Sequence, residues 1–395
     1  MRPTVSVIVP TRNRAHLLGR ALDSVFAQEG AGELFELEVI VVSDCSTDDT
    51  SAVISRYPVA GYLEYTAPRG PSAARNAGIA ASAGAFVAFQ DDDDLWLPAK
   101  LRSLIPPLLE RQDVGVAYGQ YYKFENGRRE LVPNLAHAPS GWVFRAMVGE
   151  EWHFNILNVV IRRRALDRVG YFDEGVAFSE DMDLLFRLAF QFPFTFVPGP
   201  VAVYRRSNSG LSSITLREYE EVFRTVLERA VARLSDGEAD ARARERAWAR
   251  YEAGLVSHLA WAGAFGRAHT HLRHILARPG AVNPRVLLSA VGALARGLAR
   301  KGEEPRLALQ HLSREVAAGT AGPSLARRLV AEVWAKGAVG LAGRSRPDRA
   351  LVLQAILRAM LRYPVRVWSK EVLAAIVQTV LPQRYGPMTS ARRLD

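Results

Sequence analysis

Short apolar runs alternate with helical stretches through the first half of this 395-residue chain. The runs are rich in β-branched and aromatic residues, and they are Val5–Val9, Leu37–Val42, Tyr62–Tyr65, Phe86–Phe89 and Val114–Tyr118. Stretches with helical character lie between them, among them Ala15–Gln28 and Asp48–Tyr57. This alternation predicts an α/β fold with a mostly parallel sheet and helices on both faces. Ligands of such sheets bind at the carboxyl ends of the strands, so the loops there are the expected site.

The character of the sequence changes after Ser213. Thr215 and Glu218 have capping-box spacing, and the following residues are rich in Ala, Leu and Arg. Gly and Pro breaks divide this region into helices of ordinary length. Two stretches, 267–279 and 349–364, resemble each other, because each reads as a helix that ends at a proline. The region could therefore consist of helical-hairpin repeats or of a plain helical bundle. We predict two domains, an α/β domain over 1–213 and an all-α region over 214–395.

Charge is unevenly distributed between these two regions. Residues 1–213 contain 21 Lys and Arg against 25 Asp and Glu, a net charge of −4. The whole chain has a net charge of +10, so residues 214–395 have a net charge of +14. The basic region is suited either to an anionic membrane surface or acidic partner, or simply to solvent. Nucleic acid is not expected, because aromatic residues are not interleaved with the basic ones and no zinc-ligand spacing is present.

Cysteine content and hydropathy favour a cytoplasmic protein. The single cysteine, Cys45, excludes an internal disulfide framework. Met1 is followed almost directly by the first strand, without a signal-peptide core, and no apolar run approaches the ~18 residues of a membrane span. We expect a soluble protein or a peripheral one on the inner face of the cell membrane.

Four consecutive aspartates, Asp91–Asp94, follow the apolar run that ends at Phe89. Their mutual repulsion calls for a cation, and Mg²⁺ or Mn²⁺ prefers oxygen ligands while leaving positions for substrate phosphate. Alternate residues of an extended segment face one side, so Asp91 and Asp93 could share one ion. The alternative is a solvated acidic turn that caps the next helix.

Three further charged positions follow strands or begin helices. Asp44 comes directly after a strand, where its carboxylate could accept from a base edge or ribose, whereas Ser46–Asp49 is explained by helix capping. Arg75 lies in a stretch of small residues and would point a cation into the same crevice. Glu180 and Asp181 begin a helix, where a carboxylate either caps it or removes a proton from an acceptor hydroxyl.

Taken in order, these segments resemble the inverting glycosyltransferases of family 2, which have the GT-A nucleotide-binding fold. The resemblance covers residues 3–213 and rests on the segments Val5–Arg14, Leu22–Val25, the strand that leads to Asp44, Gly70–Gly78, Asp91–Trp96, Gly170–Glu174 and Glu180–Leu184. It implies transfer of a sugar from a nucleotide-sugar donor to a glycan or lipid-linked acceptor, in cell-surface polysaccharide synthesis. A non-catalytic nucleotide- or glycan-binding module, which recruits partners through its helical half, is the alternative.

The resemblance also implies roles for matched residues. The residues it assigns to the nucleotide sugar are Thr11, Arg14, Asp44, Arg75, Asp91, Asp92 and Arg205. Among these, Asp44 would bind the nucleobase and Arg75 the diphosphate. Asp93, with Asp91, would hold Mg²⁺ or Mn²⁺. Asp181 would be the catalytic base, and Glu180 would shape the acceptor side.

Two positions depart from the family pattern. Ser43 stands where the first of two acidic residues is usual, and Ser207 stands where a histidine often lies near the diphosphate. Support for the leaving group would then come from Arg205, Arg206 or the serines that follow. On the acceptor side, the side chains of Trp142, Trp152 and His153 would either line a sugar subsite or pack beneath a loop.

The basic region contains one amphipathic stretch, 286–300. Helical spacing puts an apolar stripe on one side of it, formed by Leu287, Val291, Leu294 and Leu298, and the basic residues flanking the stripe are Arg285, Arg296, Arg300 and Lys301. Such a helix could lie on an anionic membrane surface, or its stripe could be core.

Overall fold

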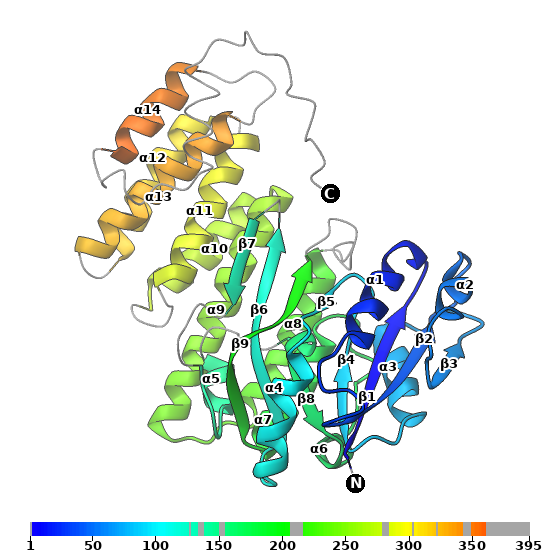
Figure 1. Ribbon diagram of the computed structural model, residues 1–395. Coiled ribbons are helices and arrows are strands. Elements are labelled where there is room, and N and C mark those ends of the chain that lie inside the picture. The colour runs from blue at the N-terminus through cyan, green and yellow to red at the C-terminus, as the bar shows by residue number, and fades with distance from the viewer. Residues whose placement is uncertain are drawn as a thin grey trace. The chain divides into compact units, whose positions relative to one another are not determined.

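A computed structural model describes residues 2–125, 128–132, 138–149, 155–205, 216–278, 284–301, 304–320, 323–342 and 349–360 (Figure 1). The chain divides into two compact units, Met1–Arg244 and Glu245–Asp395. Continuous helix begins at Leu216, close to the predicted change at residue 213. The first unit nevertheless extends to Arg244, because helix α8 (Leu216–Val231) packs against α7 (Glu180–Gln191) of the α/β unit.

The first unit contains a nine-stranded sheet with the order β3-β2-β1-β4-β8-β6-β9-β5 and with β7 paired to β6. The strands are β1 (Thr4–Thr11), β2 (Glu36–Ser43), β3 (Gly61–Glu64), β4 (Phe86–Phe89), β5 (Leu95–Trp96), β6 (Val116–Glu125), β7 (Arg128–Val132), β8 (Val159–Arg162) and β9 (Phe194–Arg205). The first four strands of this order are parallel, as predicted. Beyond β4 the sheet is mixed, since β8 runs antiparallel to both of its neighbours while β6 and β9 are parallel.

Helices cover both faces of this sheet, as the alternating pattern predicted (Figure 1). They are α1 (Ala15–Phe26), α2 (Thr50–Ile54), α3 (Pro71–Ala80), α4 (Lys100–Glu110), α5 (Phe144–Gly149), α6 (Arg163–Val169) and α7, with a 3-10 turn over Ile156–Asn158. Helix α9 (Glu238–Ala262) crosses the division between the two units.

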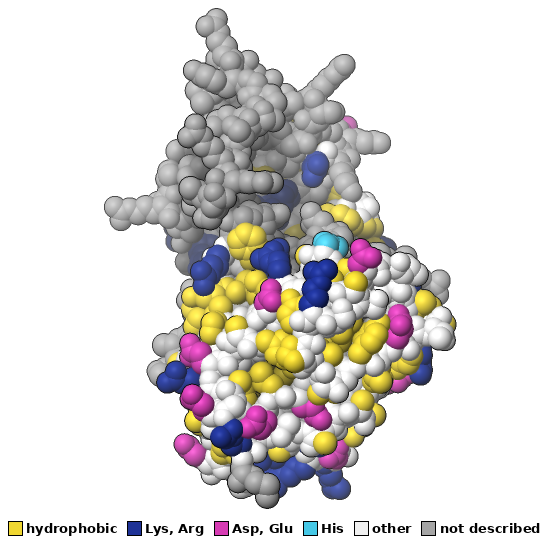
Figure 2. Space-filling model, turned by 45° about the vertical axis from the view of Figure 1, so that its right-hand side comes forward, with side chains coloured by type: hydrophobic (Ala, Val, Ile, Leu, Met, Phe, Trp, Pro, Cys, Tyr) yellow, Lys and Arg dark blue, Asp and Glu magenta, His cyan; other side chains and the backbone are white. Residues whose placement is uncertain are grey.

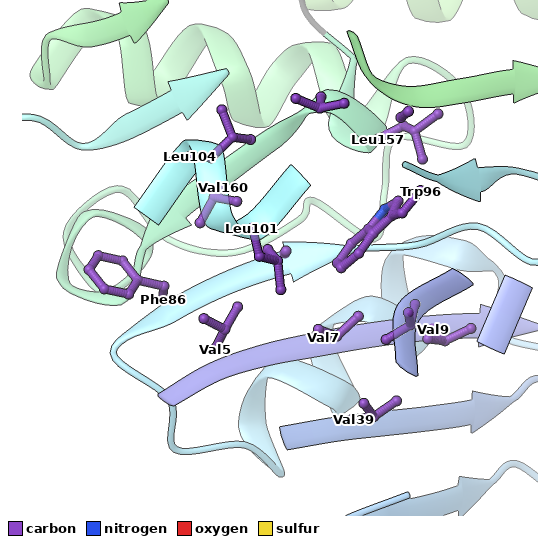
Figure 3. Close-up of a cluster of buried hydrophobic side chains, with 14 of the residues drawn as sticks. Val5, Val7, Val9, Val39, Phe86, Trp96, Leu101, Leu104, Leu157 and Val160 are labelled. Atoms are coloured by element: carbon purple, nitrogen blue, oxygen red, sulfur yellow. The ribbon is translucent and has the colours of Figure 1, made fainter. Parts of the chain in front are cut away.

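The alternation of side chains along β1 distributes its residues between two cores. Val5, Val7 and Val9 are fully buried in a cluster with Leu101 of α4 (Figure 3). Ile8 faces the other side of the sheet, where α3 lies so close that a Cβ atom on Gly78 would come within 2.3 Å of its side chain. Each such apolar side chain stabilises the fold by about 1.5–3 kcal/mol. The small residues of α3 therefore allow this helix to pack tightly on the parallel strands.

The second unit consists of helices in its described part. Besides the end of α9 these are α10 (Phe265–Leu276), α11 (Pro284–Lys301), α12 (Pro305–Gly319), α13 (Pro323–Ala342) and α14 (Arg349–Met360). Helix α13 contacts α11, α12 and α14. The second of the two similar stretches, 349–364, ends outside the described residues. No helix among the described residues has the length and apolar character needed to cross a bilayer.

The apolar stripe of α11 decides between the two alternatives that the sequence left open. Leu287, Val291, Leu294 and Leu298 are between 0% and 7% exposed, because α11 packs with α13. The stripe is core, and it is not free to lie on a membrane. The side chains of Arg285 and Lys301 lie outside the described part of the chain.

Candidate active site

The candidate site lies where the loops after β1 and β4 meet the first turn of α7. Thr11 is the last residue of β1, and Asp91–Asp94 occupy the loop between β4 and β5. Because β1 and β4 are parallel neighbours, their carboxyl ends bring these loops together. On the face of the α/β unit in Figure 2, Asp and Glu side chains are interspersed with Lys and Arg among neutral side chains.

Thr11 and Arg14 hold the middle of the acidic loop. The Thr11 hydroxyl donates to one carboxylate oxygen of Asp92 at 2.8 Å, and Arg14 Nη1 donates to the other at 2.8 Å and to Asp93 at 2.9 Å. Burial raises the pKa of Asp92 to about 6, although Arg14 opposes the rise. Burial also raises the pKa of Asp93, with Arg14 opposing and the charge of Asp91 adding to it.

Asp94 closes the acidic loop against β9. Its side chain is buried and accepts the backbone N–H of Arg205 at 2.7 Å. Burial raises the pKa of this carboxyl well above its usual range, and the charge of Asp91 adds to the effect. Arg205, predicted at the donor, is thus linked to the acidic loop through its backbone. Asp94 was not among the predicted site residues, although its place in the run of four was visible in the sequence.

Arg75 bridges the acidic loop and α7. Its Nη2 donates to Asp91 at 2.8 Å and its Nη1 to Glu180 at 2.6 Å, and its guanidinium lies 5.3 Å from the centre of the Phe172 ring. Burial opposes the charge, but the two carboxylates raise the pKa of Arg75 above its usual value. The guanidinium of Arg75, which was predicted to bind the diphosphate, is therefore already paired with two carboxylates.

Asp181 stands next to this bridge at the start of α7. Its carboxylate is half-buried and accepts the N–H of Met182 at 2.8 Å. Burial and the neighbouring charge of Glu180 raise its pKa to about 6, against the effect of Arg75. The preceding residue, Ser179, has a left-handed backbone with φ 61°. A non-glycine residue in this conformation indicates local strain, of the kind that is concentrated at functional turns.

Asp44 ties the end of β2 to the start of α3. Its two carboxylate oxygens accept the backbone N–H groups of Arg69 at 2.7 Å and Gly70 at 3.0 Å, and Arg12 lies 3.9 Å away. Asp44 therefore shapes the loop that leads into the helix of Arg75, and its predicted contact with a nucleobase remains a prediction. Of the residues interpreted as a helix cap, Asp48 accepts the N–H groups of Ala15 and Thr50, the first residues of α1 and α2, whereas the N-cap residue Asp49 makes no capping hydrogen bond through its side chain.

The acidic loop fits a magnesium- or manganese-type ion. Asp91 and Asp93 supply carboxylate oxygens, the donors such ions prefer, and burial disfavours the charge of Asp93 even with Arg14 beside it. Arg14 and Arg75 each compensate one of these carboxylates. Two carboxylates, together with water and substrate phosphate, are a usual set for Mg²⁺.

Two residues that the sequence did not reveal lie beside the site. Lys100 is fully buried, donates to the carbonyl of Leu157 at 2.6 Å and lies 3.6 Å from the centre of the Trp96 ring. Burial lowers its pKa well below the usual range, although the charges of Asp94 and Asp91 oppose this. The second residue is Tyr121 on β6, whose hydroxyl pKa is raised by burial and also by the charge of Asp181.

Neither residue has a local sequence signature, because Lys100 follows an ordinary turn and Tyr121 belongs to an unremarkable aromatic strand. Of the residues predicted for the acceptor side, Trp142 is 70% exposed. Arg206, Ser207, Trp152 and His153 lie outside the described residues.

The mixed sheet, with the acidic loop after its fourth strand, has the GT-A fold. Among solved structures, the mannosyltransferase PcManGT from Pyrobaculum calidifontis, in complex with GDP-mannose and Mn²⁺, superposes with a TM-score of 0.50 at 20% identity. The match covers 91% of this chain and 88% of that one. The predicted fold is thereby confirmed.

Residues 6–171 match the family described as Glycosyl transferase family 2. The succinoglycan biosynthesis protein ExoU of Rhizobium meliloti (strain 1021) is 30% identical over 295 residues, which are 68% of this chain and 83% of that protein. The chain therefore belongs to glycosyltransferase family 2, as its motifs predicted.

A second relative is the GalNAc(5)-diNAcBac-PP-undecaprenol beta-1,3-glucosyltransferase of Campylobacter jejuni subsp. jejuni serotype O:2. It is 37% identical over 144 residues, which are 35% of this chain and 43% of that enzyme. The chain likewise spans only 55% and 35% of the lengths of two further curated relatives.

Proposed function

We propose that this chain transfers a sugar from a nucleotide-sugar donor to a hydroxyl of a glycan or lipid-linked acceptor, with inversion at the anomeric carbon and with a divalent metal ion. The observation that carries the proposal is the placement of Asp181. It is half-buried beside the Arg75 bridge, and its pKa is raised to about 6. A carboxylate with such a pKa is ionised at neutral pH yet basic enough to accept a proton in a transition state.

In the proposed reaction, Asp181 accepts the proton of the acceptor hydroxyl as its oxygen attacks the anomeric carbon. The attack comes from the face opposite the nucleoside diphosphate, which leaves with the electrons of the broken glycosidic bond. A single displacement inverts the configuration, and the sugar passes through an oxocarbenium-like state, by analogy with glycoside hydrolysis. Glu180, fixed by Arg75, shapes the acceptor side.

The donor side of the proposal uses residues of the parallel strands. Asp93 and Asp91 would hold Mg²⁺ or Mn²⁺, and such an ion stabilises the charge that develops on a departing diphosphate. Thr11 and Arg14 fix Asp92 beside Asp93 and Asp91, and these carboxylates would face the donor as one group. Asp44 would contact the nucleobase from the loop before α3.

The remaining donor contacts belong to Arg75 and Arg205. For Arg75 we propose that the diphosphate approaches the edge of its guanidinium, whose Nε is buried and has no hydrogen-bond partner within the described part of the chain. Arg205 would support the diphosphate from the end of β9, where its backbone is already fixed by Asp94.

The acceptor class is proposed from the relatives. One is named for succinoglycan biosynthesis, and another for transfer to an undecaprenol-linked glycan. We therefore propose a role in cell-surface polysaccharide synthesis at the cytoplasmic face of the membrane. The +14 charge of residues 214–395 would favour an anionic surface, now without any contribution from the apolar stripe of α11.

The test is to screen nucleotide sugars by thermal shift with Mn²⁺, and then to assay transfer and hydrolysis with each donor that binds. We expect one donor class to stabilise the chain, EDTA to abolish its turnover, and the product to have the anomeric configuration opposite to the donor. A retained configuration would contradict the single displacement. Donor binding without transfer or hydrolysis would favour the non-catalytic binding module.

A further inference from the structure

The second unit contains a cluster of two histidines and one glutamate, at a site that the proposed reaction does not use. His271 and His274 lie three residues apart on α10, so both side chains project from the same face of that helix. Glu252 reaches them from α9. The sequence shows no zinc-ligand spacing here, because the third residue of this set is remote in the chain from the histidine pair.

The three side chains converge on one point. The Nδ1 atom of His274 is 3.3 Å from Glu252 Oε1, and the Nδ1 atom of His271 is 4.0 Å from the same oxygen. One potential ligand atom from each residue lies within 4.8 Å of the others. Zinc bonds to nitrogen and oxygen of about 2.0–2.2 Å place tetrahedral ligands roughly 3.3–3.5 Å apart. A small inward movement of the imidazoles would bring all three atoms to bonding distance.

The two oxygens of Glu252 have different surroundings. Both imidazoles face Oε1, whereas the guanidinium of Arg278 lies 3.6 Å from Oε2. The Glu252 side chain is only 14% exposed, so its orientation is restricted. Metal-binding carboxylates commonly have one oxygen on the ion and the other held by a neighbouring donor. Arg278 is placed to be that donor.

Another histidine of α10 shows how an ordinary ion pair differs. The Nδ1 atom of His269 lies 2.9 Å from Glu315, which Arg273 also contacts at 2.7 Å. There a single imidazole faces the carboxylate of Glu315, and the guanidinium of Arg273 compensates its negative charge. In the cluster two imidazoles face one oxygen. Two neutral imidazoles can each give a nitrogen lone pair to one cation. That arrangement is more favourable than one in which both donate an N–H to the same carboxylate oxygen.

We propose that Glu252, His271 and His274 bind a divalent transition-metal ion of the zinc type, with a fourth position open to water. Two imidazole nitrogens and one carboxylate oxygen suit Zn²⁺, whereas Mg²⁺ prefers oxygen ligands alone. The ion would link α9 to α10 within the second unit and would act as a staple for these helices. It is distinct from the proposed catalytic ion, which Asp91 and Asp93 would hold.

The experiment is to titrate Zn²⁺ into the untagged, metal-free full chain by calorimetry, with excess Mg²⁺ present to occupy oxygen-rich sites. We expect one equivalent of Zn²⁺ to bind, and Tm to rise by about 5 °C or more at a 100-fold excess over Kd. Co²⁺ should bind in the same place and give the visible absorption of a tetrahedral site. His274→Ala and Glu252→Gln should each weaken Zn²⁺ binding by at least about 10-fold, since each removes one ligand.

Two control variants make the result specific. His258→Gln removes an exposed histidine of α9 whose Nδ1 lies 2.9 Å from the carbonyl of Gly254, and it should leave the Zn²⁺ isotherm unchanged. Asp93→Ala should also leave it unchanged, whatever it does to sugar transfer. Zinc binding that is absent, or that is equal in the His274→Ala variant and the original chain, would overturn the proposal and leave the cluster as an ion-pair network.

Discussion

The two halves of the nine-stranded sheet contribute different chemistry to the candidate site. The parallel half, β3-β2-β1-β4, supplies Thr11, Arg14 and the acidic loop, which are joined by short hydrogen bonds. The mixed half, β8-β6-β9-β5, frames α7, which lies between β8 and β9 in the chain and begins with Glu180 and Asp181. Asp92 and Asp93 on the first side are paired with Arg14, and Asp91 is paired with Arg75. Asp181 on the second side accepts a hydrogen bond from Met182 in the first turn of its own helix and has no salt bridge among the described residues.

This difference suggests a division of labour. In the proposed reaction, residues of the parallel half hold the donor and a cation, so changes there should alter affinity. Asp181 of the mixed half accepts a proton in that reaction, so its loss should alter turnover. Arg75 joins the two halves, because its guanidinium contacts Asp91 on one side and Glu180 on the other.

The largest effect on turnover should come from Asp181→Asn. We expect kcat to fall by about 10²–10⁴ with donor affinity nearly unchanged, since a positioned base acts only on the acceptor. Steady-state kinetics and donor calorimetry measure the two quantities separately. The matched control is Asp183→Asn on the same helix, whose carboxylate is paired with Arg187 at 2.8 Å. Comparable losses of kcat in both variants would mean that α7 needs charge or stability, and that Asp181 is not the base.

The link between the halves should break in Arg75→Met. Removing one partner of a buried ion pair leaves the other charge uncompensated, and here Glu180 would remain buried. We expect the free energy of unfolding to fall by about 3–5 kcal/mol. Adding Glu180→Gln to this variant should restore part of the stability, because the unpaired charge is then gone. Additive losses in the double variant, measured by denaturant unfolding, would contradict the link.

Asp93→Ala tests the parallel half. We expect the affinity for nucleoside diphosphate in the presence of Mn²⁺ to fall by roughly 10–100-fold, because the carboxylate would join protein to metal and metal to diphosphate. Calorimetric titrations with and without Mn²⁺ measure this. Asp113→Ala, which removes an exposed carboxylate paired with Arg111, serves as the control. If the Asp93 variant keeps the full enhancement by Mn²⁺, Asp93 is not a ligand.

The same two halves differ in how far the sequence predicts them. The parallel strands are short, apolar and separated by helices, so their pattern located β1, β2, β3 and β4 to within a few residues. The carboxyl ends of neighbouring parallel strands meet, so the loops there were the expected site, with Asp91–Asp93 in one of them. The resemblance to family 2 added Thr11 and Arg14 to this site. The structure brings Thr11 and Arg14 into direct contact with Asp92, and Arg14 with Asp93.

The mixed half could not be predicted in the same way. Strand β8 runs antiparallel between β4 and β6, and nothing in the local sequence of Val159–Arg162 predicts this direction or these neighbours. The bridge from Arg75 to Glu180 joins residues that are 105 positions apart, and burial of Lys100 depends on the packing of β5 and the 3-10 turn around it. The role of Asp44 in fixing the turn before α3 also depends on tertiary structure, because its partners are backbone groups of a remote loop.

The smallest expected effect is the dependence of turnover on pH. At saturating donor, kcat should fall about twofold between pH 7 and pH 6, and roughly tenfold per unit below that, as Asp181 with its pKa of about 6 becomes protonated. The pH dependence of kcat for the original chain measures this. The residual turnover of Asp181→Asn should lack this limb. An acid limb that survives unchanged in the variant would assign the titration to another group, such as Asp92 in the parallel half.

Stability should respond to pH in the opposite direction. The pKa values of Asp92 and Asp181 are raised from 3.8 to about 6 in the folded chain, so between these values the folded state binds more protons than the unfolded state. The free energy of unfolding of the metal-free first unit therefore decreases as pH rises from about 4 to 6. Asp92→Asn should flatten this slope without removing the acid limb of kcat, and Asp181→Asn should affect both. Identical changes in the two variants would show that the parallel and mixed halves titrate as one group, and would remove the division between them.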